Sequence, residues 1–139
     1  MKRIMVDMSA TLIHHGHIRL LKKASELGYV VVALTTDEEI VNKKKFIPEL
    51  NFSEREEILS AIKFVSEIVP SPWLIDSKFL DKHNIDLLVH GADNSNPINP
   101  GRLLLLPRTE GISSSLLRER SKASLEQIAD DSNRDNNKN

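Results

Sequence analysis

The sequence predicts an α/β fold in which a doubly wound, mostly parallel five-stranded sheet is flanked by helices. Segments with a strand-like pattern alternate with segments whose apolar residues recur at helical spacing, which is typical of β-α-β units. Residues 29–34 read YVVVAL without a polar interruption, which is typical of a parallel strand buried on both faces. With 40% apolar residues among 139, the chain can bury the core of one domain.

The first part of the chain has the pattern of one β-α-β unit. Residues 3–8, RIMVDM, form a short apolar run that predicts the first strand. Apolar residues recur every three or four positions over residues 16–27, and Gly28 is expected to end this helix from the position after its last turn. With the strand over 29–34, this order predicts a right-handed parallel crossover.

The rest of the chain predicts further strands and helices. Pro48 interrupts a polar stretch, which indicates a loop, and Ser53 with Glu56 forms a capping box that predicts a helix start. Residues 130–139 are polar and rich in Asn and Asp, so we expect one domain over 1–129 followed by a disordered tail. The expected elements are a loop over 42–50, helices over 53–65, 74–82 and 113–129, and strands over 67–70, 86–91 and 102–107.

Composition and charge argue against several classes of function. The absence of cysteine removes disulfides, thiolate metal sites and cysteine nucleophiles. A formal net charge of −1 does not favour nucleic acid or a membrane surface as partner, so any anion site must come from local placement. Lys2 and Arg3 are not followed by an apolar segment long enough for a signal peptide or a membrane span. We therefore expect a cytoplasmic protein with no nucleic-acid or membrane partner.

Three segments far apart in the sequence are expected to meet at one edge of the sheet. They are residues 7–17 after the first strand, residues 90–94 (HGADN) after a later strand, and residues 107–115 (PRTEGISSS) after the last strand. Doubly wound sheets bind ligands beyond the carboxyl ends of their strands, where the strand order reverses. The convergence predicts a ligand site made of these three segments.

Three of the five histidines lie in the sequence HHGH, at the turn between the first strand and the first helix. One interpretation is a metal site, but zinc needs a third protein ligand, and the candidates His83, Asp86, His90 and Asp93 do not stand in a ligand spacing. A second interpretation is a surface or capping pair at which Gly16 only permits a tight turn. The position favours a third interpretation, an anion site.

An anion site suits this turn because a helix N-terminus presents unpaired amide groups and a partial positive charge. Gly16 lets the backbone approach a ligand closely. His14 and His17 can donate hydrogen bonds to phosphate oxygens, and a hydrogen bond to a charged group is worth about 1.5–3 kcal/mol. If that strength develops mainly in the transition state, each histidine supplies about a tenfold to hundredfold effect on rate.

Two motifs resemble signatures of the nucleotidyltransferase (cytidylyltransferase-like) superfamily. Residues 9–17, SATLIHHGH, are similar to its H-x-G-H motif, and residues 107–115 are similar to its R-T-x-G-I-S-[ST]-[ST] motif. Within the superfamily, the sequence most resembles the glycerol-3-phosphate cytidylyltransferases, over residues 4 to about 119. The resemblance implies a Rossmann-like form of the α/β fold described above.

The resemblance also implies an activity. Such an enzyme transfers CMP from CTP to a small phosphorylated or phosphonylated alcohol, such as glycerol 3-phosphate, and releases pyrophosphate for surface-polymer, lipid-headgroup or phosphonate biosynthesis. It implies a homodimer, and Mg²⁺ held mainly by the phosphates rather than by protein ligands. Two alternatives stay open: an adenylyltransferase that uses ATP, and a non-catalytic nucleotide-binding module on the same fold.

Individual residues receive roles from the resemblance, except His15, which occupies the variable position of its motif. Arg55 matches a family arginine that faces the acceptor phosphate, and no carboxylate one turn on explains it otherwise, because Ile58 and Leu59 stand there. The expected catalytic residues are His14, His17, Lys44 and Arg108; the expected nucleotide-binding residues are Ser9, Ala10, His14, His17, Asp93, Arg108, Ser113, Ser114 and Ser115; the expected acceptor-binding residues are Lys45, Arg55 and Trp73.

Three of these assignments have plainer alternatives. The run KKK at 43–45 is ordinarily a solvated loop, whereas in the family a mobile basic segment closes over the triphosphate here. The serines at 113–115 could form a plain helix N-cap. Trp73, the only tryptophan, could pack in the core instead of lining the acceptor pocket.

The sequence departs from the family pattern at two places. Residues 8–11 read Met-Ser-Ala-Thr where the family usually has Gly-Thr-Phe-Asp, and M-S-A here resembles nucleotidyltransferases linked to phosphonate biosynthesis. In HGADN, Ala92 replaces a family acid while Asp93 remains, and residues 94–102 predict a loop where a helix is usual. These departures leave the acceptor open and the triphosphate site intact.

Overall fold

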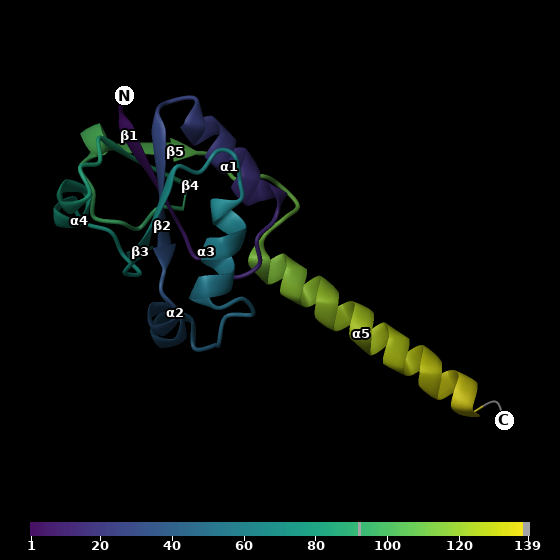
Figure 1. Ribbon diagram of the computed structural model, residues 1–139. Coiled ribbons are helices and arrows are strands. Elements are labelled where there is room, and N and C mark those ends of the chain that lie inside the picture. The colour runs from purple at the N-terminus through teal and green to yellow at the C-terminus, as the bar shows by residue number, and fades with distance from the viewer. Residues whose placement is uncertain (92, 138–139) are drawn as a thin grey trace.

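The computed structural model describes residues 1–91 and 93–137, so Ala92 lies outside the described residues. One five-stranded sheet forms its centre, with the strand order β3-β2-β1-β4-β5 and every neighbouring pair parallel. Helices lie on both faces of the sheet (Figure 1), and the predicted fold class is confirmed. The elements are β1 (Arg3–Met8), α1 (His15–Ser25), β2 (Tyr29–Thr35), α2 (Asp37–Lys44), α3 (Phe52–Ser60), β3 (Glu67–Ser71), α4 (Ser77–Lys82), β4 (Leu87–Gly91), a 3₁₀ turn (Pro100–Arg102), β5 (Leu103–Leu106) and α5 (Ser114–Asn137).

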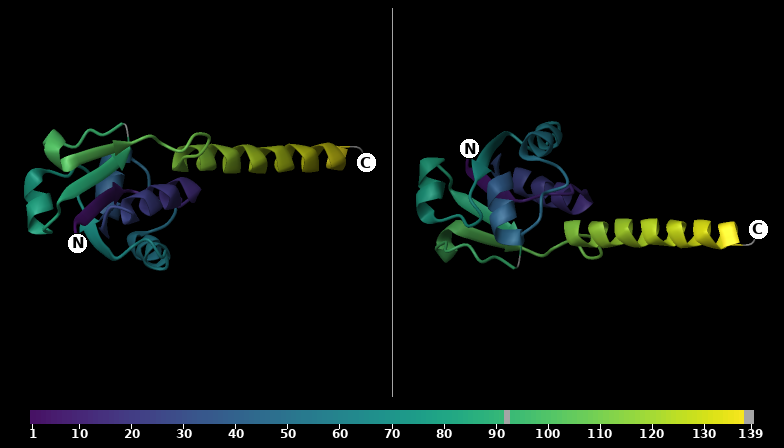
Figure 2. Two further views of the ribbon diagram at one scale, coloured as in Figure 1. Left: turned by 90° about the horizontal axis from the view of Figure 1, so that it is seen from above. Right: turned by 90° about the horizontal axis from the view of Figure 1, so that it is seen from below.

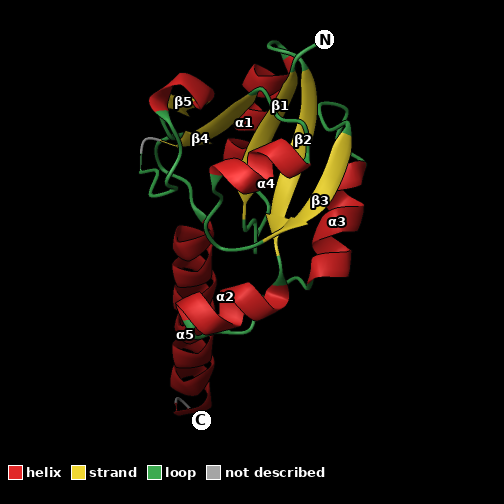
Figure 3. Ribbon diagram, turned by 90° about the vertical axis from the view of Figure 1, so that its left-hand side faces the viewer, coloured by secondary structure: helices red, strands yellow, loops and turns green. Residues whose placement is uncertain are grey.

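Successive residues of the central strands face two separate cores, one on each side of the sheet. Ile4 and Val6 of β1 pack with residues of α1 and α3, whereas Met5 between them packs with α4 on the other side. Figure 3 shows α4 on one face and α1 on the opposite face. Residues 30–34 of β2 are at most 1% exposed, which confirms that this strand is buried on both faces.

The first helix ends earlier than the sequence predicts. Glu26 is its C-cap, so α1 stops before Gly28. A Cβ atom on Gly28 would lie 2.2 Å from the carbonyl oxygen of Lys2. The Tyr29 amide donates to that same oxygen at 2.8 Å. Gly28 is therefore required because two chain segments approach closely where β2 begins beside β1.

The predicted loop over 42–50 was wrong at its start, because α2 continues to Lys44. The Thr36 hydroxyl accepts a hydrogen bond from the Glu39 amide at 3.4 Å. Acidic residues fill the first turn of α2 and lysines the last turn, which stabilises a helix that is polar on most of its surface. The helix ends at Lys45, whose φ of +62° is left-handed.

The third helix has a capping box two residues earlier than predicted. The Asn51 side chain accepts from the Glu54 amide at 2.9 Å, and the Glu54 carboxylate accepts from the Asn51 amide at 2.9 Å. The helix starts at Phe52 and ends at Ser60, not at residue 65. Asn51–Glu54 and Ser53–Glu56 both fit the capping pattern, so the sequence could not choose between them.

Helix α5 projects away from the body of the molecule (Figures 1 and 2). Residues 119–132 are exposed. The helix continues to Asn137, through most of the range where the sequence predicts a disordered tail. The Gln127 amide donates to the Asp131 carboxylate one turn on, at 3.1 Å, which supports the helix there. The domain boundary at residue 129 stays a prediction. In the described part of the chain, no helix has the length and apolar character that a membrane crossing requires.

Candidate active site

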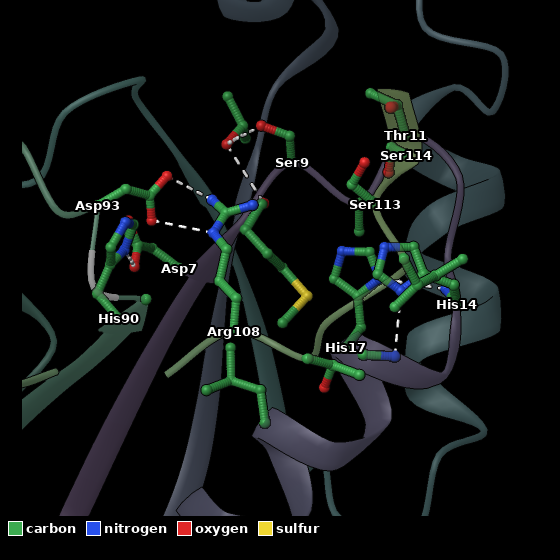
Figure 4. A pocket seen from close by; sticks show the side chains of 18 of the residues that line it. Asp7, Ser9, Thr11, His14, His17, His90, Asp93, Arg108, Ser113 and Ser114 are labelled. Carbon is green, nitrogen blue, oxygen red and sulfur yellow. Dashed lines mark hydrogen bonds and ion pairs between the residues drawn. The ribbon is translucent and has the colours of Figure 1, made fainter. Parts of the chain in front are cut away.

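A cavity of about 840 Å³ opens at the carboxyl edge of the sheet, where the loops after β1, β4 and β5 meet. The strand order reverses between β1 and β4, which is where doubly wound sheets bind ligands. All three predicted segments contribute residues to its lining, and side chains from β1, α1, β4 and α5 converge there (Figure 4). The cavity has two chemically distinct ends.

The histidine end consists of His14, His17 and the serines 113–115. His14 is the N-cap of α1, and its Nδ1 accepts a hydrogen bond from the Gly16 amide at 3.1 Å. The Nδ1 of His17 accepts from the His14 amide at 3.2 Å. The two ring centroids are 4.0 Å apart. The helix cap therefore fixes both rings side by side in the cavity wall.

These caps also determine where each imidazole carries its proton. A neutral ring that accepts at Nδ1 must hold its hydrogen at Nε2. Burial, with smaller effects of His14 and Arg108, lowers the pKa of His17 to about 3. Burial, then the His15 and Arg108 charges, lowers the pKa of His14 as well. Both rings are therefore neutral near pH 7 and offer Nε2–H as a donor, which the residues that the structure describes leave without a protein partner.

Gly16 makes this arrangement possible. A Cβ atom at Gly16 would lie 2.8 Å from Cε1 and 2.9 Å from Nδ1 of the His14 ring. Any side chain at position 16 would therefore displace the His14 ring from its cap. Gly16 is therefore needed to leave room for the His14 ring, in addition to the close approach of a ligand expected from the sequence.

The serines stand at the start of α5, and all three line the cavity. The Ser113 hydroxyl accepts from the Leu116 amide at 3.0 Å and caps the helix. The Ser114 hydroxyl donates to the Leu12 carbonyl oxygen at 3.0 Å and accepts from the Leu12 amide at 3.4 Å. Ser115 is exposed. The N-terminus of α5 thus faces the histidine pair across the cavity and is tied to the loop after β1.

Ser9 and Ala10 lie in the same loop and line the cavity. The Ser9 hydroxyl donates to Thr35 Oγ1 at 3.4 Å, and Thr35 Oγ1 donates to the Met8 carbonyl oxygen at 3.3 Å. Ala10 is 3% exposed. Its φ of +48° is a left-handed backbone conformation that residues other than glycine rarely adopt. This bent loop presents its backbone to the cavity between β1 and the histidines.

The ion-pair end consists of Asp7, His90, Asp93, Asn96 and Arg108. The Arg108 guanidinium donates to both oxygens of the Asp93 carboxylate, at 3.1 and 2.5 Å. His90 Nδ1 bonds one Asp7 oxygen, and the Asn96 side-chain amide donates to the other at 3.0 Å. Figure 4 shows Arg108 between these groups and the histidine end.

Charge pairing sets the pKa values at the ion-pair end. Burial lowers the pKa of His90, but its hydrogen bond to Asp7 and the charges of Asp7 and Asp93 outweigh burial and raise it. Burial raises the pKa of Asp93, but the hydrogen bond and charge of Arg108 outweigh this and lower it. At this end the Arg108 charge is therefore neutralised by Asp93, and Asp7 favours the protonated form of His90.

Two further predicted residues lie at the cavity wall near α2. Lys44 and Trp73 both line the cavity, and the Lys44 ammonium is 5.4 Å from the centre of the indole ring. Trp73 is half-buried and so walls the cavity instead of filling the core. Lys45 does not line the cavity; it is exposed and ends α2.

Arg55 is not where the resemblance suggests. Its side chain is fully buried and absent from the cavity wall. Nη1 donates to the carbonyl oxygens of Ser9 and Thr35 at 2.7 and 2.8 Å, Nε donates to Leu50 O at 3.0 Å, and Nη2 pairs with Asp37 at 2.6 Å. A guanidinium with these partners ties four segments together, so the structure does not support an acceptor-binding role.

Sequence reasoning placed Asp7, Thr11 and His90 in the predicted segments without giving them a role at the anion site, and it missed Phe46 and Arg118 altogether. Arg118 had a usable signal, because it stands four residues after Ser114 and so lies on the same face of a helix. The Asp7–His90 pair had none, since its partners are 83 residues apart. Among the described residues, no group of three or more His, Asp or Glu side chains could hold a metal ion.

Comparisons with known proteins show which sequences this chain is similar to. A family profile described as cytidylyltransferase-like matches residues 9–120. Glycerol-3-phosphate cytidylyltransferase of Bacillus subtilis (strain 168) is 36% identical over 125 residues, and the match covers 86% of this chain and 96% of that protein. Ethanolamine-phosphate cytidylyltransferase of Mus musculus is 35% identical over 125 residues, covering 81% of this chain and 31% of that protein. The chain therefore spans about a third of this longer relative.

A solved structure has a similar fold. The lipopolysaccharide core biosynthesis protein from Thermoplasma volcanium GSS1 aligns with a TM-score of 0.61 and 26% sequence identity. The alignment covers 68% of this chain and 78% of that chain.

Proposed function

The chain belongs to the cytidylyltransferase-like family, and from this premise we propose that it transfers CMP from CTP to a small phosphorylated or phosphonylated alcohol. Glycerol 3-phosphate is the first acceptor to test, because relatives that match this chain over nearly their whole length are glycerol-3-phosphate cytidylyltransferases. One observation carries the proposal: the imidazole pair at the start of α1 and the serines at the start of α5 line one cavity. Two helix N-termini and two N–H donors facing a common space suit a polyphosphate.

The proposed reaction is a direct displacement. A phosphate or phosphonate oxygen of the acceptor bonds to the α-phosphorus of CTP while the bond from that phosphorus to the oxygen bridging to the β-phosphate breaks, and pyrophosphate leaves with the electron pair. His14 and His17 donate Nε2–H to the oxygens where negative charge grows. Their caps hold the rings before substrate arrives, so little reorganisation is needed during the reaction.

The two ends of the cavity receive different parts of the substrates. Serines 113–115 hold the leaving phosphates at the N-terminus of α5, with Ser9 and Ala10 beside them. When CTP binds, the Arg108 guanidinium gives up its hydrogen bonds to Asp93 and donates to a phosphate oxygen instead. The released Asp93 carboxylate then faces the nucleoside. Lys44 and Trp73 line the side of the cavity toward α2, where we place the acceptor, with the Lys44 ammonium facing its anionic group.

Magnesium is part of the proposal. The two carboxylates of the ion-pair end are already paired, Asp7 with His90 and Asp93 with Arg108, so phosphate oxygens and water would supply most ligands, which is common for Mg²⁺. When bound, the ion neutralises phosphate charge. A homodimer is likewise proposed from the family resemblance, and sedimentation analysis tests it.

The test is pyrophosphate release. The protein is incubated with Mg²⁺ and CTP or ATP, together with glycerol 3-phosphate, phosphoethanolamine, phosphocholine or a hydroxyalkyl phosphonate. We expect acceptor-dependent release with CTP and at most weak release with ATP. Acceptor-dependent release with ATP but not with CTP would identify an adenylyltransferase. No release with any combination of nucleotide and acceptor would contradict the proposed reaction.

A non-catalytic nucleotide-binding module is the second candidate. It is motivated by the Asp93 carboxylate that occupies Arg108 and by the lack of an acid in residues 8–11. Calorimetry separates the two, since binding of CTP with no turnover across the acceptor panel supports the module.

A further inference from the structure

We propose that Arg118 of α5 is a positioning residue, which places Lys44 at the cavity by clamping the segment after α2 to α5 and to the loop after β1. The inference rests on the proposed function only for the role of Lys44. The clamp itself consists of Thr11, Phe46, Glu49 and Arg118.

The Arg118 guanidinium joins three segments that are distant in sequence. Nε donates to both oxygens of Glu49, at 2.7 and 2.6 Å. Nη2 donates to Thr11 Oγ1 at 2.5 Å. The guanidinium carbon lies 4.3 Å from the centre of the Phe46 ring. Hydrogen bonding at the edge and stacking on the face together hold a planar guanidinium in one orientation.

The surroundings make this more than an ordinary surface ion pair, which is worth about 0–1 kcal/mol. The Arg118 and Glu49 side chains are only 31% and 32% exposed, and Thr11 is 4% exposed. The hydrogen bond from Arg118 also holds the pKa of the Glu49 carboxyl below its usual range against the opposing effect of burial. Arg118 therefore reaches from the rim of the cavity to a buried hydroxyl.

Lys44 is two residues before Phe46 and is separated from it only by the left-handed Lys45. The position of the Phe46 ring therefore sets where α2 ends and where the Lys44 ammonium lies beside Trp73. One turn earlier in α5, Ser114 holds the backbone of Leu12. The N-terminus of α5, the loop after β1 and the end of α2 thus form one connected wall of the cavity.

The test is a double-mutant cycle on turnover. Lys44→Ala and Arg118→Ala should each lower kcat/KM for the acceptor by about tenfold to hundredfold, mostly in kcat. The double variant should be no worse than Lys44→Ala by more than about twofold, because residues that act through one another are not additive. Arg118→Lys should restore part of the rate. Losses that multiply in the double variant would show that Arg118 acts independently of Lys44 and would overturn the proposal.

A second readout does not depend on activity. Endoproteinase Lys-C should cleave at 43–45 several-fold faster in Arg118→Ala and in the milder Glu49→Gln, and the emission of Trp73, the only tryptophan, should shift in both. Arg102→Ala is the matched control, because Arg102 pairs with Asp81 at 2.7 Å outside the cavity wall. Unchanged cleavage and emission in both clamp variants would refute the clamp. If the wild type lacks turnover with every acceptor, the proposed function fails while this readout still decides the clamp.

Discussion

The two ends of the cavity prepare for a ligand in opposite ways. At the histidine end, backbone amides hold two neutral rings, and each ring keeps one N–H donor for a ligand. At the ion-pair end, the side chains of Arg108 and His90 already have carboxylate partners in Asp93 and Asp7. The first end is preorganised for an oxyanion, whereas the second must exchange partners to bind one. A neutral donor that is firmly held can therefore be better prepared for phosphate than a full positive charge.

The largest expected effect is at the histidine end. His17→Ala should lower kcat/KM by about 10²–10³-fold, the usual loss when one preorganised donor to a developing charge is removed. The measurement is steady-state pyrophosphate release with CTP and the best acceptor. His15→Ala is the control, since His15 is exposed and has no assigned role, and it should stay within about twofold of the wild type. A fully active and folded His17→Ala protein would remove the distinction between the two ends.

A smaller effect is expected at the ion-pair end. Arg108→Ala should weaken CTP binding by about tenfold to hundredfold, as expected for one lost hydrogen bond to a charged group. Asp93→Ala should instead strengthen binding of inorganic pyrophosphate by up to about fivefold, because the exposed pair that competes for Arg108 is gone. Isothermal titration calorimetry measures both constants. Weaker pyrophosphate binding in Asp93→Ala would mean that Asp93 orients Arg108 and does not compete for it.

The two ends should also respond to pH in opposite directions. The pKa of His17 is about 3 in the folded protein, below its value of about 6.5 in an unfolded chain, so the unfolded chain binds the proton first. The stability linked to His17 is therefore complete above pH 6.5 and is lost as the pH falls toward 3. His17→Asn should flatten this acid limb in melting curves recorded from pH 4 to 7. An unchanged acid limb would contradict a neutral His17.

The smallest effect concerns Asp7 and His90. The pKa of His90 is raised by Asp7 despite burial, so the stability that the pair contributes is present below pH 6.5 and is lost as the pH rises through the folded pKa. Asp7→Asn should lower the His90 pKa in an NMR titration and remove this alkaline loss of stability. A His90 pKa that does not fall in the variant would show that Asp7 does not hold the proton on the ring.

The sequence predicted what depends on local pattern. The sheet, its buried second strand and the turn at HHGH follow from periodicity and helix-end chemistry, and the structure places them as expected. Helix α2 was missed because its stability comes from the Thr36 cap and from charges at both ends instead of an apolar face. The capping box of α3 was predicted at the wrong residues, because the sequence fits the capping pattern equally well at Asn51–Glu54 and at Ser53–Glu56.

Arg55 shows why the rest could not be predicted. Its role was judged from neighbours one turn away, but its partners Ser9, Thr35 and Asp37 come from segments 18–46 residues distant. A buried guanidinium requires all of those oxygens at once, and only the folded chain brings them together. The pairing of Asp7 with His90 was hidden for the same reason, since the two residues are joined by the sheet and not by the sequence.

The caps at HHGH have a consequence for metals. A neutral imidazole has one nitrogen lone pair, and at His14 and His17 that lone pair already accepts an amide hydrogen. Zinc or nickel would have to break a helix cap to coordinate either ring through it. An oxyanion meets no such obstacle, because it binds the Nε2–H donor of each ring and leaves the cap in place. Two histidines that look like half of a chelate in the sequence thus present, once folded, N–H donors for an anion and no free lone pair for a metal ion.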